Sequence, residues 1–121
     1  MNIAIFSRLV AREYANVTDD MPDYPYSFED VLSIFLDFFD LYAEYRGESH
    51  PPLKCERIRQ YIQIMPYQDR ASGAISDYEP FEYKGMIERY FETPFKNCDY
   101  RIGHFFSGYI RHYREWEILY E

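Results

Sequence analysis

The sequence predicts an all-α protein, a compact bundle of about five helices in a single domain covering residues 1–121. Three observations predict this fold. Hydrophobic residues recur every three to four positions in successive segments. Proline and glycine residues separate these segments and leave short connections between them. Of the 121 residues, 47% are hydrophobic and 28% are charged, so one domain can both bury a core and cover it.

The first helix is expected over residues 3–15, and residues 16–26 are expected to form a loop. Hydrophobic side chains recur at helical spacing in the first segment: Ile5, Leu9, Val10 and Tyr14. The loop segment contains two adjacent aspartates and two prolines, which disfavour a continuous helix. Ser27 follows the loop and is a good N-cap for a second helix.

The second helix is expected over residues 27–46, because Gly47 is a suitable C-terminal stop. Apolar residues cover more than half of its circumference, so we expect this helix at the centre of the bundle. The remaining narrow strip is polar, with members spaced by three and four: Asp30, Ser33, Asp37, Asp40 and Glu44. Carboxylates are therefore expected to align along one face without a counter-charge on the same helix.

Two shorter helices follow. The third is expected to begin after Pro51 and Pro52 and to end at Pro66. Its expected buried stripe comprises Cys55, Ile58, Tyr61, Ile62 and Met65. A small polar loop over residues 67–77 precedes the fourth helix, expected over residues 80–92. The inward side chains of that helix are expected to be Tyr83, Met86, Ile87, Tyr90 and Phe91.

The last helical segment is expected to begin near Asn97 or Asp99, either of which is a suitable cap. Gly108 interrupts its apolar stripe, which predicts a kink or a break into two short helices. Residues 115–121 also fit a short C-terminal strand.

Negative charge is concentrated in the first half of the chain. The net charge is −8, and no lysine or arginine occurs between Glu13 and Tyr45. Nine carboxylates lie in that block: Glu13, Asp19, Asp20, Asp23, Glu29, Asp30, Asp37, Asp40 and Glu44. A one-sign field of this density repels nucleic acid and anionic lipid and attracts cationic surfaces. Non-specific binding of DNA or RNA needs phosphate neutralisation by lysine and arginine, so this charge balance disfavours it.

The sequence contains no recognisable catalytic, cofactor or metal motif, and we expect no enzymatic activity, no cofactor and no bound metal. No serine or cysteine lies in a nucleophile signature, and no carboxylates match a calcium loop or a di-iron site. His50 precedes a proline and is expected to be exposed. His104 and His112 lie eight positions apart, and with Cys98 or Glu115 they match zinc-ligand spacing only poorly.

The expected location is the cytoplasm. Cys55 and Cys98 form no disulfide framework, and we expect both to be free, buried thiols in a reducing compartment. The apolar run at residues 3–6 is broken by Arg8, so no signal peptide is expected. No apolar stretch reaches membrane-spanning length. If the source is a virus or phage, the expected location is the host cytoplasm.

The acidic block predicts a partner-binding surface. Its residues are Asp19, Asp20, Asp23, Tyr24, Tyr26, Asp30, Asp37, Asp40 and Glu44. Helix neighbours at i and i+4 are about 5–6 Å apart at Cβ, a separation comparable with that of successive phosphates. A rigid acidic helix can therefore present charge much as a nucleic-acid backbone does, with Tyr42 and Tyr45 adding contact area. A solvated surface that only maintains solubility is the alternative interpretation.

No motif identifies a family. In small size, acidity, tyrosine content and lack of a catalytic signature, the chain resembles the inhibitors that phages deploy against nucleic-acid-processing defence complexes, anti-CRISPR proteins among them. This resemblance is one of general character. It implies a non-enzymatic inhibitor that occupies the cationic nucleic-acid-binding surface of a basic protein or nucleoprotein.

Two other functions are compatible with the sequence. One is a small helical DNA- or RNA-binding regulator, in which arginines follow the backbone and nearby tyrosines stack on bases. Its basic residues would be Arg57, Arg59, Arg111 and Arg114. The other is a structural or assembly module whose aromatic residues form a homodimer or larger homo-oligomer.

Overall fold

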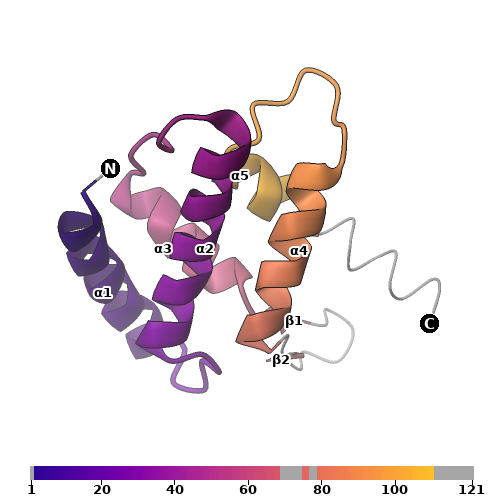
Figure 1. Cartoon of the computed structure of the whole chain (residues 1–121). Coiled ribbons are helices and arrows are strands. Elements are labelled where there is room, and N and C mark those ends of the chain that lie inside the picture. The colour runs from indigo at the N-terminus through magenta and orange to yellow at the C-terminus, as the bar shows by residue number, and fades with distance from the viewer. Residues whose placement is uncertain (1, 69–74, 77–78, 111–121) are drawn as a thin grey trace.

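Helices surround one hydrophobic core in the computed structural model, which describes residues 2–68, 75–76 and 79–110 (Figure 1). In chain order, the elements are α1 (Ile3–Asp20), α2 (Phe28–Arg46), α3 (Cys55–Ile64), β1 (Tyr67–Gln68), β2 (Ile75–Ser76), α4 (Pro80–Glu92), α5 (Ile102–His104) and the π-helical turn η1 (Phe105–Tyr109). The prediction of an all-α bundle is confirmed.

α1 is more than one turn longer than the sequence predicts. The helix continues to Asp20, and Thr18 Oγ1 donates a hydrogen bond to the Tyr14 carbonyl at 3.0 Å. Val17 is fully buried, so packing of this turn outweighs the preference of its polar neighbours for a turn. The inward face also differs from the prediction, because Ile5 is 55% exposed.

α2 has the boundaries that the sequence predicts. Ser27 Oγ accepts a hydrogen bond from the Asp30 amide at 3.1 Å, which caps the first turn. Gly47 ends the helix in the left-handed conformation, with φ of 73°, which glycine adopts without steric cost. α2 packs against both α1 and α4, so it occupies the central position predicted for it (Figure 1).

α3 and α4 also lie where proline positions predict them. α3 packs mainly against α1, and α4 packs against α2. All five side chains predicted to face inward from α4 are buried: Tyr83, Met86, Ile87, Tyr90 and Phe91. Between these helices, in the predicted loop, β1 and β2 form a two-residue antiparallel pair with Tyr67 opposite Ser76.

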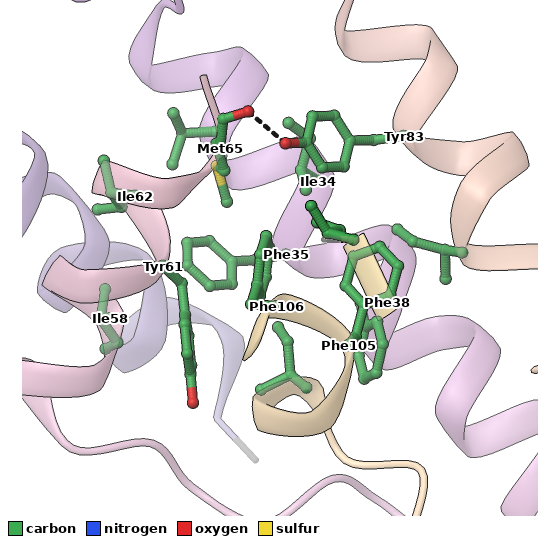
Figure 2. Close-up of a cluster of buried hydrophobic side chains, with 14 of the residues drawn as sticks. Ile34, Phe35, Phe38, Ile58, Tyr61, Ile62, Met65, Tyr83, Phe105 and Phe106 are labelled. Atoms are coloured by element: carbon green, nitrogen blue, oxygen red, sulfur yellow. Dashed lines mark hydrogen bonds between the residues drawn. The ribbon is translucent and has the colours of Figure 1, made fainter. Parts of the chain in front are cut away.

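Aromatic rings fill much of the core where α2, α3, α4 and η1 meet (Figure 2). Tyr61 of α3 stacks on Phe106 of η1 with ring centroids 5.0 Å apart. Gly103 permits this packing, because a Cβ at that position would lie 3.1 Å from the Tyr61 hydroxyl. The Tyr83 hydroxyl donates a hydrogen bond to the Met65 carbonyl, so the polar end of this buried ring is satisfied (Figure 2).

The last described helix begins at Ile102 with Arg101 as its N-cap, so the predicted caps Asn97 and Asp99 are wrong, and it changes type at Phe105, before the break predicted at Gly108. α5 passes directly into η1, and Gly108 lies within this π-helical turn. A π-helical turn inserts a residue into an α-helix and is frequent at functional sites. The strand considered for residues 115–121 lies outside the described residues.

Candidate functional site

The seven predicted carboxylates fall into two groups. The first, called here the acidic end, lies at the C-terminus of α1 and in the following connection: Asp19, Asp20 and Asp23. The second, called the acidic edge, runs along α2: Asp30, Asp37, Asp40 and Glu44. Figure 1 shows the α1–α2 connection and the start of α2 at the same end of the bundle, so the two groups adjoin there.

The acidic edge is a straight line of charge on a well-supported helix. From Asp30 to Glu44 the helix rises by about 21 Å at 1.5 Å per residue. The spacing of these carboxylates keeps them within about a quarter of the helix circumference. The opposite side of α2 is fixed in the core, where Val31, Phe35 and Phe38 have no exposed surface.

These carboxylates are presented to solvent without an internal ion-pair partner. None of the seven lies within 4.0 Å of a lysine or arginine nitrogen in the ranges that the structure describes. Asp30 and Asp37 are half-buried, and the remaining five are exposed: Asp19, Asp20, Asp23, Asp40 and Glu44. Asp19 and Asp20 belong to the last turn of α1, so their predicted placement in a loop is wrong.

Asp37 connects the acidic edge to α4. Burial raises the pKa of Asp37, and the Asp40 and Glu88 carboxylates raise it further, whereas Lys84 opposes them. Glu88 and Lys84 of α4 therefore lie near the acidic edge with opposite charges, and the sequence prediction included neither. The sequence shows that residues 77–95 are acidic, with five acids and two bases. Only the packing of α4 on α2 shows that Glu88 is the acid that lies near Asp37.

Each acidic group contains charges that are unfavourable for the fold itself, although Asp30, in the first turn of α2, is favoured by the helix dipole. Like charges at i and i+4, such as Asp40 and Glu44, cost a few tenths of a kcal/mol per pair. Asp19 and Asp20 lie at the negative end of the α1 dipole, where an anion is disfavoured by about 0.3–1 kcal/mol. No basic residue in that last turn offsets them. Local costs of this kind are often associated with function.

Tyr24 and Tyr26 hold the α1–α2 connection in place. Tyr26 is 4% exposed, and its carbonyl accepts a hydrogen bond from the Tyr14 hydroxyl at 2.6 Å. The Tyr24 hydroxyl donates to the Ile62 carbonyl of α3 at 2.6 Å, and burial raises the pKa of Tyr24. Tyr26 is therefore wrongly predicted as a surface contact, and Tyr24 is only partly exposed. Their role in the candidate site is to position the segment that carries Asp23.

Tyr42 and Tyr45 differ in exposure. Tyr42 is 1% exposed and belongs to the core, with its hydroxyl 3.3 Å from the Glu48 carboxylate. Tyr45 is 48% exposed, and its ring stacks on Phe91 of α4 with centroids 5.4 Å apart. Of the two, Tyr45 is the one that can supply contact area near the end of the acidic edge.

Glu13 belongs to the acidic block of the sequence but not to the acidic surface. Its side chain has no exposed area, and Arg59 Nε donates a hydrogen bond to it at 2.8 Å, which joins α1 to α3. This hydrogen bond lowers the pKa of Glu13, and burial opposes the effect. Arg59 is thus engaged within the molecule, which weakens the nucleic-acid-binding alternative. That alternative also needs Arg111 and Arg114, which lie outside the described residues.

We expect Arg59→Ala to destabilise the protein more than Arg57→Ala, a control on the same helix that loses only an exposed hydrogen bond to Gln60. Arg59→Ala removes the closest partner of the buried Glu13 carboxylate and leaves only the longer contacts with Asn16 at 3.4 Å and Arg12 at 4.0 Å. Because the folded pKa of Glu13 lies below its ordinary value of 4.5, the contribution of the pair is full above that pH and is lost as the pH falls through the folded pKa. Urea unfolding at neutral and acidic pH measures this. An Arg59→Ala effect that is equally large after carboxyl protonation would contradict the assignment.

His50 is buried, contrary to the prediction, with 4% of its surface exposed. Its Nδ1–H donates to the Pro51 carbonyl at 2.8 Å, and its Nε2 accepts from the Ile102 amide at 3.0 Å. The α2–α3 connection is thereby fastened to the start of α5. Burial lowers the pKa of His50, which the Pro51 carbonyl opposes; Arg101 lowers this pKa and Asp99 raises it. The Ile102 partner lies too far away in sequence for a local pattern to reveal it.

We expect the protein to lose stability as the pH falls below 6.5, the ordinary pKa of His50. The unfolded chain takes up this proton first, because the folded pKa is lower, so the stability that neutral His50 contributes is present above pH 6.5 and declines towards the folded pKa. His50→Gln should flatten the pH dependence of the urea midpoint between about pH 7 and pH 5. Parallel pH profiles for the wild type and the variant would refute this role.

The described ranges contain neither a metal-ion cluster nor a membrane-spanning helix. No three histidine, cysteine, aspartate or glutamate side chains among the described residues are grouped so that they could hold a metal ion. His112 and Glu115, considered as ligands from the sequence, lie outside those ranges. In the same part of the chain, no helix combines the length and the hydrophobicity needed to cross a membrane.

Comparisons with protein-family models, with curated proteins and with solved structures found no match. The class of protein is therefore defined by the fold and the surface alone. It is an all-α bundle with a central helix that carries an acidic edge.

Proposed function

We propose that this chain is a non-enzymatic binding protein that docks its acidic surface on a cationic surface of a partner. The observation that carries the proposal is the set of seven carboxylates without ion-pair partners among the described residues, four of them aligned on α2. Fields of one sign attract surfaces of the opposite sign and speed their encounter.

The partner surface that fits best is one that normally holds nucleic acid. Such surfaces present lysine and arginine side chains spaced to meet successive phosphates. The acidic edge offers charges at helical spacings of about 5–6 Å along a line of about 21 Å. Because the fully buried Phe35 and Phe38 anchor α2 in the core, little conformational entropy should be lost on docking.

An inhibitory role follows from this mode of binding. A protein that occupies a cationic nucleic-acid-binding channel prevents the natural ligand from entering it. The proposal therefore includes inhibition of a nucleic-acid-processing complex of the kind that phages counteract, with action in the host cytoplasm.

Affinity capture with the whole chain as bait tests the function. At low ionic strength, we expect it to retain a nucleic-acid-binding protein or nucleoprotein, which added salt and added duplex DNA should each release. A bait carrying Asp40→Lys and Glu44→Lys should retain less of the same protein. Equal retention by both baits, or a complex that neither salt nor duplex releases, would refute the proposal.

Self-association is a second candidate, favoured by three exposed apolar side chains. Ile3 and Ile5 on α1 are 59% and 55% exposed, and Phe81 on α4 is 75% exposed. Light scattering across a dilution series separates the candidates. A mass that stays at one chain over the whole series excludes the homo-oligomeric module.

A further inference from the structure

Cys98, His104 and Tyr90 meet at the end of the bundle where α4 and α5 come together. Cys98 Sγ lies 3.3 Å from His104 Nδ1. The Tyr90 hydroxyl lies 2.9 Å from the same nitrogen and 3.8 Å from the sulfur. Tyr90 is fully buried, whereas Cys98 and His104 are partly exposed. The expectation that Cys98 is buried is therefore wrong, and its thiol is free.

The backbone around Cys98 is held in an unusual conformation. Asn97 and Tyr100 both have φ of 56°, in the left-handed region that residues other than glycine rarely adopt. This conformation brings the Tyr100 amide within 3.3 Å of Cys98 Sγ as a donor. The Tyr100 hydroxyl secures the loop by donating to the Thr93 carbonyl at 2.6 Å and accepting from the Phe95 amide at 2.7 Å. The sulfur is thus fixed between an amide donor and an imidazole.

His104 lies where α5 passes into the π-helical turn η1. Its Nδ1 faces Cys98 and Tyr90, and its Nε2 has no hydrogen-bond partner within the described ranges. Gly108 places no side chain against this edge of the ring, since a Cβ there would lie 3.7 Å from Nε2. When Nδ1 accepts the hydrogen of the Cys98 thiol, Nε2 carries the hydrogen of the neutral ring, and the Tyr90 hydroxyl lies beside both the nitrogen and the sulfur.

A cysteine within hydrogen-bonding reach of a histidine that can take its proton is the arrangement of an activated nucleophile. Exposed side chains of both charges lie near Cys98. Lys96 and Arg101 are exposed near Cys98, and the Arg46 guanidinium lies over the Tyr100 ring, 5.5 Å from its centroid. Asp99 offsets part of this charge through its 3.8 Å contact with Arg101. Lys96 and Arg101 can pair with the carboxylates of a small co-reactant that approaches Cys98.

We propose that Cys98 is a modifiable thiol that forms mixed disulfides with small anionic disulfides of the glutathione type, with His104 as the base. The thiol proton passes to His104 Nδ1, and the thiolate attacks one sulfur of the disulfide. A new bond forms between Cys98 Sγ and that sulfur while the original S–S bond breaks. The departing thiolate takes the proton from the imidazolium and leaves as a thiol, so the exchange needs no further oxidant.

Cys55 provides a control within the same molecule. It is also free, and it is partly exposed at the first residue of α3, so its predicted burial is wrong as well. Unlike that of Cys98, its thiol has no hydrogen-bond partner among the described residues.

The experiment uses the whole chain with oxidised glutathione as the probe and follows modification of each cysteine by peptide mass spectrometry. We expect Cys98 to react at least about tenfold faster than Cys55. This factor is smaller than the acceleration that a positioned general base usually gives. His104→Asn keeps a polar group facing Tyr90 but cannot take the proton. It should slow Cys98 towards the Cys55 rate and leave Cys55 unchanged.

A merely structural role for His104 predicts the opposite sign, because loosening the loop would expose Cys98 and accelerate its reaction. Equal rates at the two cysteines of the wild type, or a Cys98 rate that His104→Asn does not reduce, would overturn the proposal. If the variant does not fold, the wild type in urea replaces it. There the rate advantage of Cys98 should disappear, and an advantage that persists in urea would show that the folded arrangement is not its cause.

Discussion

Phe38→Ala should lower the free energy of unfolding by about 3–5 kcal/mol, which is among the largest losses expected from one substitution in this core. Phe38 has no exposed surface. Its ring centroid lies 5.1 Å from that of Phe91, 5.5 Å from that of Phe105 and 5.8 Å from that of His50. These rings come from α4, η1 and the α2–α3 connection, so the substitution opens a cavity where three parts of the fold meet α2.

Urea unfolding followed by circular dichroism measures this loss. Phe81→Ala is the matched control, because Phe81 is 75% exposed and its truncation should change stability by no more than about 0.5 kcal/mol. A Phe38→Ala loss no greater than that of Phe81→Ala would show that the described core does not hold the bundle together.

Replacing Asp40 and Glu44 together by lysine should weaken binding to the captured partner at least about tenfold at low ionic strength, or by about 1.4 kcal/mol. Both side chains are exposed on the acidic edge, so the reversal changes the field that the partner meets. The fold should not suffer. The substitutions exchange one like-charge pair at i and i+4 for another, place a lysine three residues from Asp37, and put a cation near the C-terminus of α2, where the helix dipole favours it.

The control for this pair is Glu56→Lys with Glu82→Lys, which changes the net charge equally. Both residues are exposed in the first turns of α3 and α4, where the helix dipole favours carboxylates, so this control should be slightly less stable. We therefore expect the control pair to bind the partner although it is slightly less stable. The Asp40→Lys and Glu44→Lys pair should fail to bind although its fold is intact. Equal weakening by both pairs would mean that only net charge matters, and the acidic edge would lose its role.

Local signals explain which helices could be predicted. Ser27 and Gly47 mark the ends of α2, and Pro66 and Pro80 mark the end of α3 and the start of α4, because caps and prolines act on their own neighbourhood. The end of α1 could not be predicted in this way. Val17 keeps the helix going through its contacts in the core, and those contacts involve residues distant in sequence.

In the candidate site, too, some features follow from local sequence and others depend on contacts between distant residues. The alignment of Asp37, Asp40 and Glu44 follows from helical periodicity alone. The burial of Tyr26 and His50 does not, because it depends on the packing of separate elements. The cluster at Cys98 depends on a loop and a π-helical turn, neither of which has a simple periodic signature.

The most direct measurement of the central claim is competition for the nucleic-acid-binding surface of the captured partner. Fluorescence anisotropy of a labelled duplex bound to that partner is followed while the chain is added. The anisotropy should fall to that of the free duplex with the wild type and remain high with the Asp40→Lys and Glu44→Lys variant. Anisotropy that stays high or rises as the wild type binds would show that protein and duplex occupy the partner together, which is incompatible with occupation of one shared surface.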